Sequence, residues 1–314
     1  MKNRLFIIIC LILLLAACIP PSLALTATSR PTAASTATAT PTPPGPFDYD
    51  ASIPFDPKVN SEKQRDGVSI TDLSYAAHEA SFSPNTGGRT VAYLVRPQGA
   101  GPFAGVIYLH WLGNISGNRN EFLQEAVETA QHGAVALVLQ GFFPWMAAPR
   151  GTQEDVPLMV GQATELRRAV DFLLTQPQVD PARIGFVGHD YGAMYGGMLA
   201  GSDRRLKTYV LIAGVPSFAD WITSFHIAHD AYVPLVKDID PINFIGQAAP
   251  ASLLFQFGQH DAFISEDLAN RYYEAASQPK QVEWFDDIHD MTTEVVRHAR
   301  LAWLIWQLDL DPTP

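Results

Sequence analysis

The feature that most constrains the fold is a regular alternation, beginning near residue 105, of short apolar runs with amphipathic helical patterns. Apolar runs predict strands at 106–109, 134–139, 184–187, 208–212, 252–257 and 281–285. Helical patterns occupy 119–132, 158–175, 191–200, 266–276 and 294–308. Apolar strands separated by amphipathic helices are typical of a parallel sheet covered on both faces. We therefore predict an α/β protein with a mostly parallel, doubly wound sheet, which would bind ligands at the carboxyl ends of its strands.

The chain before residue 105 has a different pattern. Residues 80–97 predict a β-hairpin, with strands at 80–82 and 90–95 joined by a turn rich in Asn and Gly. Residues 47–66 are polar and interrupted by proline, which predicts an extended arm.

The N-terminus predicts an export signal. Lys2 and Arg4 precede an uncharged apolar run at 5–15, which is too short to span a bilayer comfortably. The following Leu15-Ala16-Ala17-Cys18 resembles the lipobox of bacterial lipoproteins, which implies a signal peptide at 1–17 and a lipid on Cys18. The alternative is an ordinary signal peptide cut near Ala24.

Residues 18–46 are rich in Thr, Ala, Ser and Pro, a composition that predicts a disordered tether. The remaining 47–314 predict one domain, with a short lid insertion at about 215–248. We expect a protein secreted across the cytoplasmic membrane and lipid-anchored at the bacterial cell surface or periplasmic face. The net charge of −11 argues against nucleic acid as a partner. The oligomeric state and the membrane leaflet stay open.

The sequence Gly188-His189-Asp190-Tyr191-Gly192 lies between the predicted strand at 184–187 and the helix at 191–200. A small-x-nucleophile-x-small pattern at a strand-to-helix turn is typical of a nucleophile elbow, where neighbouring glycines permit a strained backbone. The residue at the nucleophile position is Asp190.

This pattern resembles the nucleophile elbow of the α/β-hydrolase superfamily, in which serine is usual; no G-x-S-x-G occurs in the chain. The aspartate elbow resembles haloalkane dehalogenases and epoxide hydrolases. The flanking sequences 179–185 and 255–258 are more similar to dienelactone hydrolases. The resemblance implies an α/β-hydrolase fold and a hydrolase acting on a small molecule.

The superfamily order of nucleophile, acid and histidine implies a triad of Asp190, Asp261 and His289. Asp261 follows the strand at 252–257 and His289 follows the strand at 281–285. Asp261 would orient His289, and His289 would activate water. The alternative is that Asp261 caps the next helix and His289 is an ordinary loop histidine.

An aspartate nucleophile changes the expected chemistry because a carboxylate is already charged at neutral pH. Its natural reaction is displacement at a saturated carbon, giving an alkyl ester that water then hydrolyses. Attack on an ordinary ester would give a high-energy mixed anhydride, so an ester or lactone would instead require Asp190 to position water.

The resemblance also implies two backbone N–H donors for an oxyanion, from Tyr191 and Trp111. Trp111 stands where the family usually has glycine, so it either shapes the pocket or belongs to the core. We expect His110, Trp145 and Trp221 to line the substrate pocket. Trp111, Tyr191 and Asn114 could donate hydrogen bonds to a departing halide.

The run 226–230 contains His226, His229 and Asp230, residue types that can bind zinc and that are spaced as on a helix. The sequence places no further ligand beside this run. There is no dinucleotide-binding fingerprint or phosphate loop, and we expect neither cofactor nor metal. Two functions remain open: a surface-anchored hydrolase for a small apolar ester, lactone or carbon electrophile, and an inactive binding module that keeps the fold.

Overall fold

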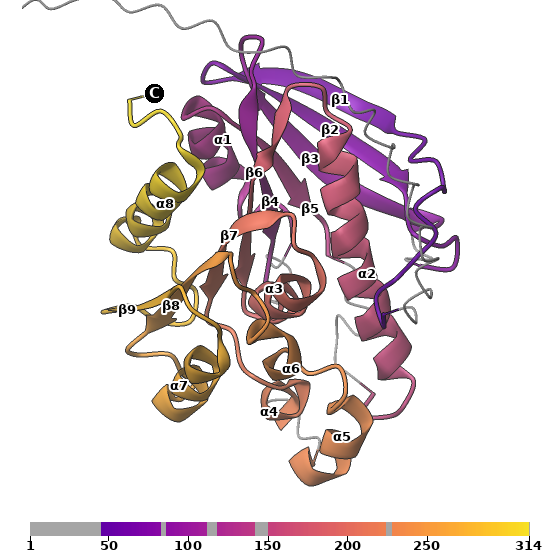
Figure 1. Cartoon of the computed structure of the whole chain (residues 1–314), viewed down its shortest axis with the longest axis vertical. Coiled ribbons are helices and arrows are strands. Elements are labelled where there is room, and N and C mark those ends of the chain that lie inside the picture. The colour runs from indigo at the N-terminus through magenta and orange to yellow at the C-terminus, as the bar shows by residue number, and fades with distance from the viewer. Residues whose placement is uncertain (1–44, 83–85, 112–117, 142–149, 224–227, 314) are drawn as a thin grey trace, which may run out of the picture. The chain divides into compact units, whose positions relative to one another are not determined.

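A nine-stranded sheet forms the centre of the domain in a computed structural model that describes residues 45–82, 86–111, 118–141, 150–223 and 228–313 (Figure 1). The strands are β1 (Lys58–Arg65), β2 (Val68–Ala76), β3 (Arg89–Pro97), β4 (Phe103–Leu109), β5 (Ala134–Leu139), β6 (Val179–His189), β7 (Leu206–Ile212), β8 (Ser252–Gly258) and β9 (Lys280–Phe285). Their order is β1-β2-β3-β5-β4-β6-β7-β8-β9.

The sheet has two parts. Strands β1, β2 and β3 pair antiparallel with one another, and β3 pairs antiparallel with β5. From β5 to β9 every pairing is parallel. The sequence prediction of a mostly parallel α/β sheet is therefore confirmed.

Helices cover both faces of the parallel part. They are α1 (Leu123–Gln131), α2 (Asp155–Leu174), α3 (Tyr191–Ser202), α4 (Phe218–Ile222), α5 (His229–Val236), α6 (Ile242–Ile245), α7 (Glu266–Ala275) and α8 (Glu294–Leu308). Buried Arg300 of α8 forms a bidentate ion pair with Glu125 of α1, which joins these two helices on one face. Helices α2 and α3 pack against the other face (Figure 1).

Two predictions for the N-terminal part are wrong. Residues 80–82 lie in a turn, and the antiparallel partner of β3 is β2. The arm predicted at 47–66 contains β1, an edge strand exposed along almost its whole length. Because neither face of β1 is buried, its sequence lacks the apolar alternation by which strands are recognised. The apolar residue at position 82 comes from a buried turn and not from a strand, because Phe82 packs against Gly161 of α2.

The region predicted as a lid, 215–248, lies between β7 and β8 and contains α4, α5 and α6. Tyr232 of α5 donates a hydrogen bond of 2.8 Å to Asp155, a buried carboxylate at the start of α2. The same carboxylate accepts hydrogen bonds from the backbone of Arg150 and Gly151. This segment is therefore fixed to α2 through a buried polar contact.

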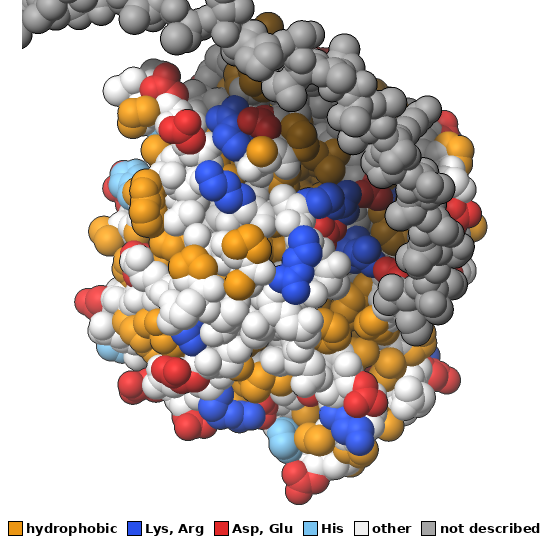
Figure 2. Space-filling model, in the orientation of Figure 1, with side chains coloured by type: hydrophobic (Ala, Val, Ile, Leu, Met, Phe, Trp, Pro, Cys, Tyr) orange, Lys and Arg blue, Asp and Glu red, His pale blue; other side chains and the backbone are white. Residues whose placement is uncertain are grey.

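The molecular surface carries both signs of charge on the face seen in Figure 2, with apolar side chains between them. Among the described residues, no helix combines the length and the hydrophobicity that crossing a membrane would require. The predicted signal peptide, Cys18 and tether fall outside the described residues.

Candidate active site

The turn between β6 and α3 holds Asp190 in a rare backbone conformation, with φ of 51° and ψ of −111°. Positive φ is unfavourable for a residue with a Cβ, and such strain persists only where the surroundings enforce it. Here the Asp190 N–H donates to Ile212 of β7 at 2.8 Å, and the Asp190 carbonyl accepts from Met194 of α3 at 3.1 Å. The turn has the geometry of a nucleophile elbow.

Two glycines allow this turn to form. A Cβ on Gly192 would overlap the carbonyl oxygen of Leu109 in β4, and a Cβ on Gly188 would overlap the backbone of Gly192. The backbone of the elbow therefore lies so close to the neighbouring backbone that a side chain at either glycine would not fit.

Gly192→Ala is expected to destabilise the domain by roughly 3 kcal/mol, because rigid backbone must move to admit the methyl group. Chemical denaturation of the purified variant measures this loss. Gly45→Ala is the control, since its added Cβ would make only ordinary contacts with Asp48. Equal stability of the two variants would contradict the close approach at the elbow.

The structure brings Asp190, His289 and Asp261 together at the carboxyl ends of three strands. His289 lies after β9, and its Nδ1 is 2.8 Å from Oδ2 of Asp261, which lies after β8. On the other side of the ring, Nε2 of His289 is 3.8 Å from Oδ1 of Asp190. That separation exceeds a hydrogen bond, so no direct hydrogen bond joins these two atoms.

Asp261 acts on His289 rather than on the next helix. Its Oδ1 accepts the backbone N–H groups of Phe263 at 2.8 Å and Ile264 at 2.9 Å. The N-cap of α7 is Ser265, whose hydroxyl accepts from Leu268. The alternative interpretation of Asp261 as a helix cap does not describe this structure.

The carboxyl groups of Asp190 and Asp261 have opposite pKa shifts. Burial dominates at Asp190 and raises its pKa, although the charges of His289 and His189 oppose this. Burial would also raise the pKa of Asp261, but the hydrogen bond and charge of His289 outweigh it and lower the pKa. Asp261 is therefore held as a carboxylate, the form that orients an imidazole.

His289 has a pKa above its ordinary value. Burial would lower it, but the hydrogen bond to Asp261 and the negative charges of Asp190 and Asp261 raise it. Phe263 packs edge-on against the ring with centroids 5.0 Å apart, so one side of the base is covered by an apolar group.

Trp221 of α4 contacts the elbow directly. Its indole Nε1 donates a 3.0 Å hydrogen bond to Oδ1 of Asp190. The backbone N–H of Tyr191 donates to the same carboxyl group. The Tyr191 ring packs on Trp221 with centroids 4.7 Å apart. Trp221 and Tyr191 thus lie at the site, as donors to the carboxylate.

Trp111 is placed differently from the expected oxyanion donor. Its backbone N–H donates to Oε2 of Glu121 at 2.9 Å, so this donor is already occupied. The indole ring stacks on His189, with centroids 5.5 Å apart and planes 9° apart, and lies 5.9 Å from the ring of His289. Its side chain, rather than its amide, faces the triad.

His110 is fully buried, and its ring is held by the surrounding chain. Nδ1 lies 2.7 Å from the carbonyl of Trp111, and Nε2 accepts the backbone N–H of Gly141 at 3.0 Å. Burial lowers the pKa of this imidazole. His110, which was expected to line the pocket, is held by the main chain of Trp111 and Gly141. Asn114 and Trp145 lie outside the described residues.

The suggested zinc ligands do not form a metal site in the described part of the chain, where no group of three His, Cys, Asp or Glu side chains is arranged to hold a metal. His229 is bonded to Asp230 and Asp220 at 3.0 and 3.1 Å. His226 lies outside the described residues.

Two residues of the site were missed in the sequence. His189, at the variable position of the elbow, faces Glu121 with Nδ1 at 2.7 Å and the carbonyl of His289 with Nε2 at 2.9 Å. Its place in the elbow pattern, directly before Asp190, was a sequence signal for His189. Glu121 precedes α1 and carries no motif that could have revealed it.

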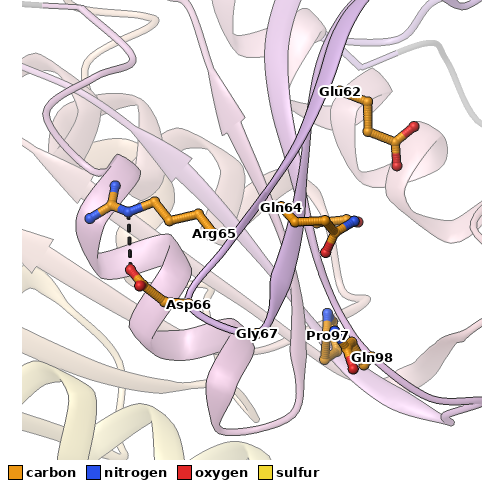
Figure 3. Close-up of a pocket in the computed structure, with 8 residues that line it drawn as sticks. Glu62, Gln64, Arg65, Asp66, Gly67, Pro97 and Gln98 are labelled. Carbon is orange, nitrogen blue, oxygen red and sulfur yellow. Dashed lines mark hydrogen bonds and ion pairs between the residues drawn. The ribbon is translucent and has the colours of Figure 1, made fainter.

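A separate hollow of about 530 Å³ lies at the β1–β2 turn, lined by Glu62, Gln64, Arg65, Asp66, Gly67, Ser69, Pro97 and Gln98 (Figure 3). Pro97 pairs with Val68 at the end of the sheet where the parallel strands begin. This hollow is therefore at the opposite end of the sheet from Asp190.

The topology, the elbow and the triad define an α/β-hydrolase fold. Structural comparison agrees: an acetyl xylan esterase from a Paenibacillus species matches with a TM-score of 0.63 and 18% identity, over 81% of this chain and 90% of that chain. Acetyl xylan esterase 1 from a Thermoanaerobacterium species matches with a TM-score of 0.65 and 14% identity, over 83% and 91%. An S-formylglutathione hydrolase from Agrobacterium tumefaciens matches with a TM-score of 0.57 and 16% identity, over 80% and 99%.

At the sequence level, no family model matches the chain. Acyl-coenzyme A thioesterase 3 of Mus musculus is 30% identical over 151 residues, which are 45% of this chain and 32% of that protein. The chain thus spans about a third of the length of the curated relative it matches.

Proposed function

We propose that this protein is a hydrolase in which Asp190 is a covalent nucleophile, His289 the base and Asp261 the residue that orients it. The observation that carries the proposal is the position of the Asp190 carboxylate: on a strained elbow, hydrogen-bonded by Trp221, and 3.8 Å from an imidazole that is itself bonded to Asp261. The substrate is a small apolar molecule with an electrophilic saturated carbon.

In the first step an oxygen of Asp190 forms a bond to that carbon while the bond to the leaving group breaks. The leaving group departs with the electron pair, as a halide or as the oxygen of an opened strained ring, which then takes a proton from solvent water. The product is an alkyl ester on Asp190. A carboxylate needs no base for this step because it carries no proton to lose.

In the second step His289 takes a proton from water, and the water oxygen attacks the carboxyl carbon of the ester. The N–H of Tyr191 is placed to stabilise the oxyanion, since it already donates to this carboxyl group. Collapse breaks the bond from carboxyl carbon to alkyl oxygen. The alcohol leaves with the proton from His289, and Asp190 retains one oxygen from water.

A second candidate is hydrolysis of an ester, thioester or lactone, with Asp190 positioning water. The similarity to esterases and to a thioesterase favours it, as does the likeness to dienelactone hydrolases in 179–185 and 255–258. Asp190 would then never become covalently modified. In either case the proposed setting is a lipid anchor on Cys18 at the bacterial cell surface or periplasmic face.

His289→Gln is expected to stall the reaction after the first step, because the ester on Asp190 then lacks a base to activate water. The purified variant is incubated separately with haloalkanes, epoxides, lactones and aryl esters, and intact and peptide masses are recorded. We expect a mass increase on the peptide carrying Asp190 with one class of carbon electrophile.

The matched control is His298→Gln, which replaces an exposed histidine of α8 and is expected to turn over substrate without accumulating adduct. Turnover of lactones or esters by the wild-type protein with no adduct in His289→Gln would support the water-mediated candidate. No adduct and no wild-type turnover with any class would support a binding module.

A further inference from the structure

His189 is a side chain of the elbow that the reaction above does not use, and both of its ring nitrogens have a hydrogen-bond partner. It is 2% exposed. Its Nδ1 lies 2.7 Å from Oε1 of Glu121, and its Nε2 lies 2.9 Å from the main-chain carbonyl of His289. The indole of Trp111 stacks on one face of its ring. His189 therefore links the chain before α1 to the loop that carries the base.

Both ring nitrogens of His189 face oxygen atoms. The carbonyl of His289 can only accept, so Nε2 carries a hydrogen. An ionised Glu121 also only accepts, so Nδ1 needs a hydrogen as well. The second oxygen of Glu121 accepts the N–H of Trp111 at 2.9 Å, which favours the ionised carboxylate. All these contacts are satisfied by an imidazolium paired with a carboxylate.

We propose that His189 and Glu121 are positioning residues: the pair holds the main chain of the loop carrying His289 and keeps a positive charge beside Asp190. The kinetic part of this inference rests on the proposed hydrolase function. The structural part, concerning the protonated ring and the held loop, does not.

The charge beside Asp190 would serve the first step. Burial disfavours the ionised carboxylate that must attack, and the two positive charges that oppose this come from His289 and His189. The groups facing His189 are Glu121 from the chain before α1, Asp190 from the elbow, and His289 from the loop after β9. His110, which follows β4, is also near enough for the charge of His189 to lower its pKa. Without His189, the charge of His289 and the hydrogen bonds from Trp221 and Tyr191 would remain to favour ionisation of Asp190.

The holding role is tested without any substrate. In the wild-type protein, ¹⁵N spectra of the imidazoles at about pH 7 should show hydrogens on both ring nitrogens of His189. In Glu121→Gln the hydrogen on Nδ1 should be lost. Amide hydrogen exchange in residues 286–293 should be about tenfold faster in His189→Ala, because the hydrogen bond to the His289 carbonyl is gone. His189→Gln, which keeps a neutral donor, should restore most of the protection.

The charge role is tested by the pH dependence of adduct formation in the His289→Gln background. Adding His189→Gln or Glu121→Gln should move the acid limb of the rate to higher pH, because Asp190 loses its nearby cation. The control is His132→Gln, since His132 is also buried and bonds a main-chain carbonyl, that of Asp311, away from the site. It should leave the limb and the exchange of residues 286–293 unchanged.

A His189 ring with one hydrogen would overturn the charged pair, and unchanged exchange in His189→Ala would overturn the holding role. If the acid limb of the adduct-formation rate does not move in His189→Gln, the proposal that His189 favours ionisation of Asp190 is wrong. If no electrophile gives an adduct or turnover, the hydrolase proposal fails by itself, and the spectra and exchange rates still decide the role of the pair.

Discussion

Asp190→Ala is expected to reduce turnover by on the order of 10⁴-fold or more, because the variant lacks the atom that forms the bond to substrate. The same change in the His289→Gln background should abolish the adduct. The measurement is kcat/KM on the substrate that the wild-type protein turns over fastest, together with the peptide mass spectrum. Circular dichroism should show an unchanged fold.

The matched control is Asp203→Asn. Asp203 is also a buried aspartate bordering α3, but it lies at the opposite end of the helix and is paired with Arg205. Activity should stay near the wild-type level. Substantial turnover in Asp190→Ala would place the chemistry elsewhere in the molecule.

Asp261→Asn is expected to lower the rate of the hydrolytic step by about 10³ to 10⁴-fold, because an amide no longer orients His289 or stabilises its cation. It should also change the pH dependence. His289 acts as a base when neutral, so the wild-type rate rises with pH through a pKa raised above its ordinary value. Removing the carboxylate takes away the hydrogen bond that raises this pKa, so the rise should shift to lower pH.

The experiment follows release of alcohol from the pre-formed alkyl enzyme across the pH range. Asp267→Asn serves as control because this aspartate is exposed on α7. A midpoint that stays at the wild-type pH in Asp261→Asn would show that Asp261 does not set the protonation of His289.

The sequence was sufficient to predict the parallel sheet and the three groups of the candidate site. Apolar runs marked the buried strands, and Asp190, Asp261 and His289 each follow such a run, so the topology alone brings them to one edge. Strand β1 was missed because its exposed edge position removes the apolar pattern. The partner of β3 was placed at 80–82, where the buried Phe82 imitates a strand residue, although the partner is the largely buried β2.

Contacts between distant parts of the chain could not be predicted. Glu121 and His189 are 68 residues apart, and nothing in the local pattern of either indicates the other. Trp111 was expected to offer its amide to an oxyanion, but that amide is bonded to Glu121. Which donor a carboxylate accepts depends on three-dimensional proximity, and neither spacing nor residue type determines it.

The indole hydrogen bond from Trp221 has an evolutionary consequence. Helices α4, α5 and α6 lie between β7 and β8, outside the sheet, where a substitution would ordinarily leave the reactive groups alone. Here Trp221 of α4 donates to the carboxylate of Asp190, the proposed nucleophile. Under the proposed mechanism, a substitution of Trp221 would alter substrate choice and the reactivity of Asp190 together. New specificities in descendants of this protein should therefore arise more readily from α5 and α6 than from α4.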